Sequence, residues 1–100
     1  MTVKVANKVE TSSTVFQPKK YNVVFHNDNK TTMEFVMQLL VYIYDYDASS
    51  AYNTMMEVHE RGAKIVGSYT KEIAESKQSK SVQLAINNGY PDFKVTVEES

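Results

Sequence analysis

Short apolar runs alternate with polar loops from Tyr21 onward, and their spacing predicts three strands. The run YNVVFH at 21–26 is rich in β-branched and aromatic residues, which suit a half-buried pleated surface. AKIVGSY at 63–69 predicts a second strand. In FKVTV at 93–97, apolar and polar residues alternate, which predicts a third strand with one face in water.

A helix is predicted directly after the first strand, because apolar residues recur there at steps of three and four. Its predicted buried face consists of Met33, Val36, Met37, Leu40 and either Ile43 or Tyr44. The tetrapeptide from Thr31 to Glu34 has the form of a capping box. We therefore expect Thr31 to cap a helix that starts near Thr32.

A second helix is predicted at about 48–61, with Asp47 as its N-cap and Gly62 as a left-handed C-terminal cap. Its apolar face is Ala48, Ala51, Tyr52, Met55, Val58 and His59. A third helix is expected to begin after Thr70 and to end before Gly89 and Pro91.

The resulting order is β-α-α-β-α-β. Three short strands cannot bury an apolar face by themselves, so we expect an α+β two-layer sandwich in which a three-stranded antiparallel sheet packs against three helices. This core spans 21–98. Residues 1–20 carry four lysines, one glutamate and no sustained period, and are predicted to be a flexible tail.

Length and composition narrow the classes of function. A chain of 100 residues is one domain, and a net charge of -1 gives no argument for nucleic acid or anionic lipid. There is no cysteine, no apolar run long enough to span a membrane and no signal-peptide core. These features predict a cytoplasmic or organelle-stroma protein without a bound cofactor.

The candidate residues for binding or catalysis are His26, Asn27, Asp28, Asn29 and His59. Asn and Asp favour such loops because they bond their own main chain, so loop geometry alone can explain them. An enzymatic interpretation would pair His59 with Asp28, but the sequence offers no activated nucleophile and no Gly-rich phosphate loop. A metal site of His26, Asp28 and His59 lacks the helical two-histidine spacing of known metal motifs.

The same stretch resembles the ClpS family of Clp protease adaptors. YNVVFHNDNKTTMEF at 21–35 is similar to the family's strand followed by Asn-Asp-Asp-x-Thr-Pro-Met-Glu-x-Val. MMEVH at 55–59 resembles its Met-x-x-Val-His, and Gly62 with TKEIAESK at 70–77 resembles its Gly and Thr-x-Glu-x-Ala-Glu-x-Lys segments. The resemblance covers about 20–98, in the same order.

The resemblance implies a receptor for amino-terminal degrons. Members bind the first residue of a substrate, usually Leu, Phe, Tyr or Trp, and transfer the substrate to the Clp AAA+ unfoldase and its protease. By position, Asn27 and His59 would accept hydrogen bonds from the free α-amino group. Asn29 falls where the family has a second acidic residue, and Asp28 would add backbone contacts and negative charge.

The resemblance also implies an apolar pit for the first side chain. Its walls would be Thr31, Met33, Val36, Met55 and Val58. Met33 corresponds to the family's gatekeeper, whose bulk is expected to exclude β-branched Ile and Val. On the third helix, Glu72 and Lys77 correspond to contacts with the amino-terminal domain of the unfoldase, and the tail before Pro18 to the arm used in delivery. A solvated helix face and a disordered terminus would explain the same residues.

Three positions depart from the family pattern, and the closing segment YPDFKV aligns poorly with it. Asn29 replaces an Asp, which removes a charge near the amine. His26 replaces an aliphatic residue beside the pocket and is expected to narrow the pocket or change its preference. Thr32 replaces a Pro at the first helical turn. Either Asp92 or Phe93 falls at the last pocket position, and of the two only Phe93 is chemically suitable.

The leading hypothesis is therefore a non-enzymatic adaptor that recognises degrons. The alternative is an interaction domain of the same fold that modulates the unfoldase without degron binding, and an enzyme comes third.

Overall fold

The computed structural model describes residues 19–100 and shows the predicted order of elements. These are β1 (Tyr21–His26), α2 (Met33–Tyr42), α3 (Ala48–Arg61), β2 (Ala63–Tyr69), α4 (Lys71–Asn87) and β3 (Lys94–Glu99). Most of the predicted tail, 1–18, lies outside the described residues. In the described part of the chain, no helix is long and apolar enough to cross a membrane.

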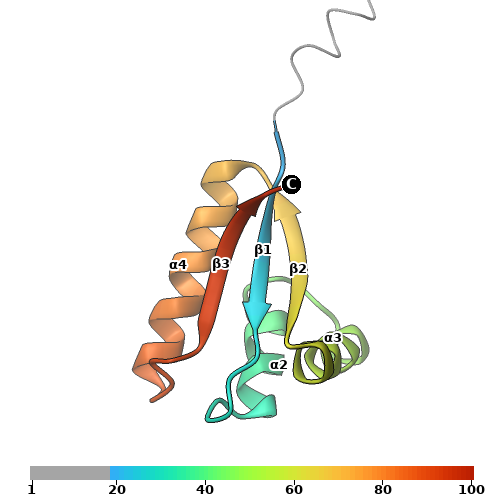
Figure 1. The fold of residues 1–100 in the computed structure, drawn as a ribbon, viewed down its shortest axis with the longest axis vertical. Helices are drawn as coiled ribbons and strands as arrows, with labels where there is room; N and C mark the ends of the chain where they lie inside the picture. The colour runs from blue at the N-terminus through green and yellow to red at the C-terminus, as the bar shows by residue number, and fades with distance from the viewer. Residues whose placement is uncertain (1–18) are drawn as a thin grey trace, which may run out of the picture.

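The three strands form one antiparallel sheet in the order β2-β1-β3. Helix α4 lies along one face of this sheet and contacts all three strands (Figure 1). Helices α2 and α3 gather at the end of the sheet where β1 finishes and β2 begins. The fold is therefore the α+β arrangement of three strands and three helices that the pattern predicts.

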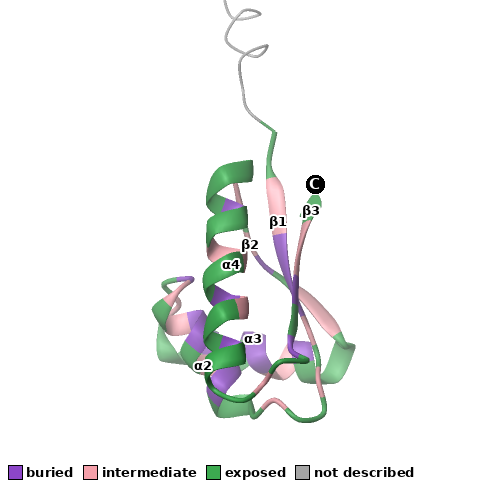
Figure 2. Ribbon diagram, turned by 90° about the vertical axis from the view of Figure 1, so that its left-hand side faces the viewer, coloured by how far each residue is buried: buried purple, intermediate pink, exposed green. Residues whose placement is uncertain are grey.

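The core forms between the central strand and the helices, because Val23 and Phe25 of β1 are fully buried and belong to one apolar cluster with residues of the helices. Figure 2 shows α4 beside this buried stretch. The ring of Phe25 meets Tyr44 and Phe93 edge to face, with centroids 5.3 Å and 5.2 Å away. Such edge-to-face pairs are a favoured aromatic geometry and fix how the α2–α3 corner and the start of β3 sit against β1.

Helix α2 buries a slightly different face from the predicted one. Val36 and Leu40 are buried as expected, and so are Phe35 and Leu39. Met33 was assigned to the buried face, but its side chain is 41% exposed. The reason is position: Met33 lies in the first turn of α2, which borders an open pocket.

The caps of the helices are mostly as predicted. Asp47 accepts a 2.7 Å hydrogen bond from Ser50 N–H at the start of α3, and Gly62 ends α3 with φ +90°. Thr70 occupies the N-cap position of α4, but its side chain makes no capping hydrogen bond. The prediction that Thr31 caps α2 is wrong, because Thr32 occupies that position.

Candidate functional site

A pocket of about 390 Å³ opens between α2, α3 and the segment of residues 27–32, called here the pocket loop. Its size lies in the range typical of small-ligand sites. Ten residues line it: Asn27, Asp28, Asn29, Thr31, Thr32, Met33, Val36, Met55, Val58 and His59. All nine residues that the resemblance predicted for a degron site are among them.

The pocket loop is held in place by its own polar groups. Asn27 N–H donates a 2.9 Å hydrogen bond to the carbonyl oxygen of Gly62, which joins the start of the loop to the end of α3. The Asp28 carboxylate accepts a 3.2 Å bond from Lys30 N–H and a 2.6 Å bond from the Thr31 hydroxyl group. A single Asp side chain thus closes a tight turn, as Asx residues commonly do in loops.

The Thr31 hydroxyl group is therefore committed to Asp28 and does not cap the helix. Thr32 caps it instead: its backbone is extended, with φ -71° and ψ 150°, and its side-chain oxygen accepts a 3.2 Å bond from Phe35 N–H. This arrangement puts Thr32 itself on the pocket wall. The capping-box pattern indicates Thr31 alone, but the hydrogen bond to Asp28 occupies the Thr31 hydroxyl group and leaves the cap to Thr32.

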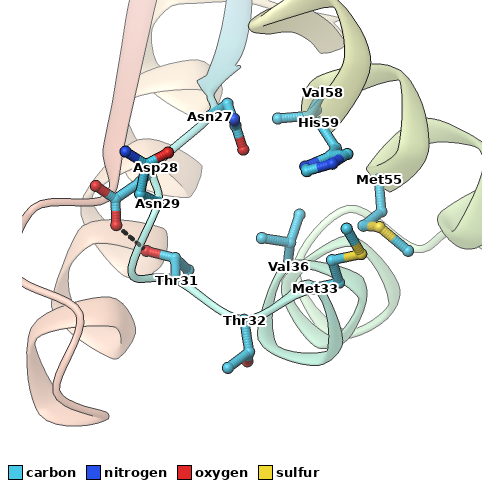
Figure 3. Close-up of a pocket in the computed structure, with 10 residues that line it drawn as sticks. All are labelled: Asn27, Asp28, Asn29, Thr31, Thr32, Met33, Val36, Met55, Val58 and His59. Carbon is cyan, nitrogen blue, oxygen red and sulfur yellow. Dashed lines mark hydrogen bonds between the residues drawn. The ribbon is translucent and has the colours of Figure 1, made fainter.

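Two polar side chains point into the mouth of the pocket from opposite sides. The amide group of Asn27 projects from the end of β1, and the imidazole ring of His59 projects from α3 (Figure 3). Both residues are exposed at the surface. An amide oxygen and a neutral imidazole nitrogen are hydrogen-bond acceptors, so this pair can hold a group that carries several N–H donors.

The walls below this mouth are apolar. Met33 and Val36 come from the first turn of α2, and Met55 and Val58 come from α3. Val36, Val58 and Met55 are buried, whereas Met33 stands at the rim. Methionine side chains are flexible and polarisable, so these walls can adapt to an aliphatic or an aromatic group.

Two residues expected near the pocket do not line it. His26 turns away, because its Nε2 atom lies 2.9 Å from the Thr96 hydroxyl oxygen on β3. Phe93 is 4% exposed and packs against Phe25 in the core. The expectation that His26 narrows the pocket is therefore wrong, and Phe93 serves the core. Thr32 also lines the pocket, although neither the sequence pattern nor the resemblance predicted it there.

The geometry gives no support to the enzymatic pairing of Asp28 with His59. The Asp28 carboxylate bonds to the pocket loop, and in residues 19–100 no hydrogen bond joins it to the imidazole. Within the same residues, no group of three His, Asp or Glu side chains is placed to hold a metal ion.

The two residues predicted to contact an unfoldase differ in exposure. Glu72 is exposed in the first turn of α4. Lys77 is only half-exposed, and its ammonium group donates a 2.7 Å hydrogen bond to the carbonyl oxygen of Ile43 at the end of α2. The ammonium group of Lys77 is therefore engaged in an intramolecular hydrogen bond.

The chain matches known proteins along most of its length. Residues 16–96 match the family model described as ATP-dependent Clp protease adaptor protein ClpS. Among its relatives, the ClpS adapter of Desulforapulum autotrophicum is 43% identical over 82% of this chain and 78% of its own. That of Campylobacter jejuni is 42% identical over 83% of this chain and 85% of its own.

A solved structure agrees with the fold as well as with the sequence. The structure described as Agrobacterium tumefaciens ClpS2 bound to L-phenylalaninamide superposes with a TM-score of 0.80 at 30% identity. The match covers 84% of this chain and all of that one. From the family model, the relatives and the shared fold, we conclude that this chain belongs to the ClpS family of Clp protease adaptors.

Proposed function

We propose that the pocket binds the first residue of substrate proteins with an amino-terminal Leu, Phe, Tyr or Trp, and that the protein delivers these substrates to a Clp AAA+ unfoldase. The observation that carries the proposal is the placement of Asn27 and His59 at the mouth of an apolar pocket. A free amino terminus places a positively charged amino group next to the first side chain of the substrate. This site correspondingly places hydrogen-bond acceptors next to an apolar wall.

The pocket recognises the α-amino group through hydrogen bonds. An α-ammonium group has three N–H donors, and bonds from a charged donor are stronger than those between neutral groups. The Asn27 amide oxygen and the His59 imidazole supply two acceptors, and the Asp28 carboxylate adds negative charge in the pocket loop. Asn29 adds a polar group without a charge, so the ammonium meets one carboxylate in this loop.

The pocket recognises the side chain of the substrate's first residue by burying it. Met33, Val36, Met55 and Val58 remove an aliphatic or aromatic group from water, which contributes about 25 cal/mol for each Å² of apolar surface. The similar protein from Agrobacterium is described as bound to L-phenylalaninamide, a free amine beside an aromatic ring. Met33 at the rim disfavours β-branched side chains, whose bulk lies next to the amine.

The adaptor acts without catalysing a reaction of its own. Its contact with the amino-terminal domain of the unfoldase includes Glu72 on the exposed side of α4. Lys77 supports that contact indirectly. Its ammonium group donates a hydrogen bond to the carbonyl oxygen of Ile43 and so stabilises the neighbouring surface.

The experiment is fluorescence anisotropy with peptides that carry a carboxyl-terminal label and differ only at residue one. Leu, Phe, Tyr and Trp peptides with a free amine should bind, whereas Ile, Ala and all amino-acetylated peptides should not. Asn27→Ala and His59→Ala should each weaken binding at least tenfold, or about 1.4 kcal/mol. Binding of acetylated and free peptides with equal affinity would contradict the proposal. Binding of the unfoldase without any peptide binding would favour a modulator of the unfoldase instead.

A further inference from the structure

We propose that Tyr90 is a positioning residue for the pocket: it holds Thr32, and through Thr32 the end of the pocket loop, from the turn between α4 and β3. This inference rests on the proposed function, because the effect of the positioning is measured as affinity for a peptide with a free amino terminus.

The backbone of Tyr90 is fixed on both sides. Gly89 lies two residues beyond the end of α4, and its φ of +89° is a left-handed conformation that favours glycine. Tyr90 N–H donates a 2.7 Å bond to the carbonyl oxygen of Ala85, and Gly89 N–H donates a 3.1 Å bond to that of Ile86. This pair of bonds is a Schellman motif. The Tyr90 carbonyl oxygen in turn accepts a 3.3 Å bond from Phe93 N–H.

From this fixed point, the Tyr90 side chain reaches the first turn of α2. Its hydroxyl oxygen lies 3.3 Å from the hydroxyl oxygen of Thr32. Its ring packs on the ring of Phe35, with centroids 5.0 Å apart. Thr32 and Phe35 are the two partners of the hydrogen bond that caps α2. Tyr90 therefore contacts both sides of the bond that sets where the pocket loop ends and the helix begins.

Hydrogen bonds hold the pocket loop at three places: its start, its middle and its end. Its start is bonded backbone to backbone, by Asn27 to Gly62, and its middle is closed by Asp28 and Thr31. Its end depends on Thr32, which is exposed. Because Met33 and Val36 follow in the first turn of α2, a shift at Thr32 would move the apolar wall relative to the polar mouth. Tyr90 opposes that shift.

The test compares two variants that each remove one tyrosine hydroxyl group. Tyr90→Phe keeps the ring on Phe35 and loses the contact with Thr32. Tyr46→Phe is the matched control, since the Tyr46 hydroxyl group donates a 2.6 Å bond to the carbonyl oxygen of Val66, outside the pocket lining. Tyr90→Phe should weaken binding of a Phe-initiated peptide about threefold to tenfold. Tyr46→Phe should leave that affinity within about twofold while it lowers the melting temperature.

A double-mutant cycle shows whether the effect passes through Thr32. In a Thr32→Val background the hydroxyl partner is absent, so adding Tyr90→Phe should change affinity no further. Equal affinity of Tyr90→Phe and the unmodified protein would overturn the inference, as would full additivity in the cycle.

Amide hydrogen exchange separates this inference from the proposed function. If the unmodified protein binds no peptide, the proposed function fails, but exchange can still be measured in the pocket loop. Faster exchange at 29–33 in Tyr90→Phe than in Tyr46→Phe supports the positioning role, and equal exchange in the two variants contradicts it.

Discussion

The ammonium group of Lys77 lies 5.6 Å from the centre of the Tyr44 ring and 5.2 Å from that of Tyr69. Together with its hydrogen bond to Ile43, this places a cation between two aromatic rings and the carboxyl end of α2, where a positive charge is favoured. Helix α4 is thus tied to the corner that joins the two helices of the pocket.

Replacing Lys77 by Met should reduce stability, because Met keeps the apolar stem but loses the charged donor. We expect the free energy of unfolding to fall by about 1 to 2 kcal/mol. Glu72→Gln is the control on the same helix and should change it by less than about 0.5 kcal/mol, since Glu72 is exposed. Urea unfolding followed by circular dichroism measures both. Identical midpoints for the two variants would show that the Lys77 contacts do not stabilise the fold.

Met33→Ala should broaden the preference of the pocket. Removing the thioether from the rim makes room for a branch at the β-carbon, so the ratio of Leu-peptide to Ile-peptide affinity should fall about tenfold. Met37→Ala is the control, because Met37 lies one turn further along α2 and does not line this pocket. The two ratios come from the anisotropy titrations described above. An unchanged ratio in Met33→Ala would show that another part of the pocket determines the preference for Leu over Ile.

Acid should weaken peptide binding through His59. A protonated imidazole has no acceptor nitrogen and carries a positive charge beside the ammonium group of the ligand. Affinity should therefore be lower in acid than at neutral pH. In His59→Gln this dependence should disappear, whereas His26→Gln should keep it, because His26 contacts Thr96 on β3. A flat profile in the unmodified, folded protein would contradict the role of His59.

Alkali should destabilise the fold through Tyr44. Burial raises the pKa of Tyr44 to about 12, although its hydrogen bond with Ser81 acts in the opposite direction. An unfolded tyrosine has a pKa of about 10, so between about pH 10 and 12 the unfolded state loses this proton first and stability falls. The loss approaches about 3 kcal/mol above that range and is absent below about pH 10. Urea midpoints at two alkaline pH values should show a smaller loss in Tyr44→Phe than in the unmodified protein.

The elements of the fold were predictable because each has a local signal. The left-handed Gly62 and the Asp47 cap delimit α3, and the β-branched run of 21–26 identifies β1. The start of α2 was misplaced by one residue, since the capping-box pattern indicates Thr31 whereas the neighbouring Thr32 is the cap. The choice between them is made by a hydrogen bond from Thr31 to Asp28, which the spacing of residues does not reveal.

Nine of the ten residues that line the pocket were predictable from the resemblance, and Thr32 was not. What could not be predicted is the direction in which a side chain turns. His26 contacts Thr96 on the neighbouring strand β3, and Phe93 fills the space beside Phe25. The contacts of Lys77 with Ile43 likewise join residues that are far apart in sequence, so only the packing of α4 on the corner reveals them.

The hydrogen bond between Asn27 and Gly62 joins the two sides of the pocket mouth at one backbone junction. Asn27 begins the pocket loop there, and Gly62 closes the helix that carries His59. The two polar groups thus share a short backbone frame, while the residues that shape the apolar wall are Met33 and Val36 of α2 and Met55 and Val58 of α3. Under the proposed function, exchanges in that wall would change which side chain is accepted without disturbing the frame, so selectivity could diversify while the groups proposed to bind the amino terminus stay constant.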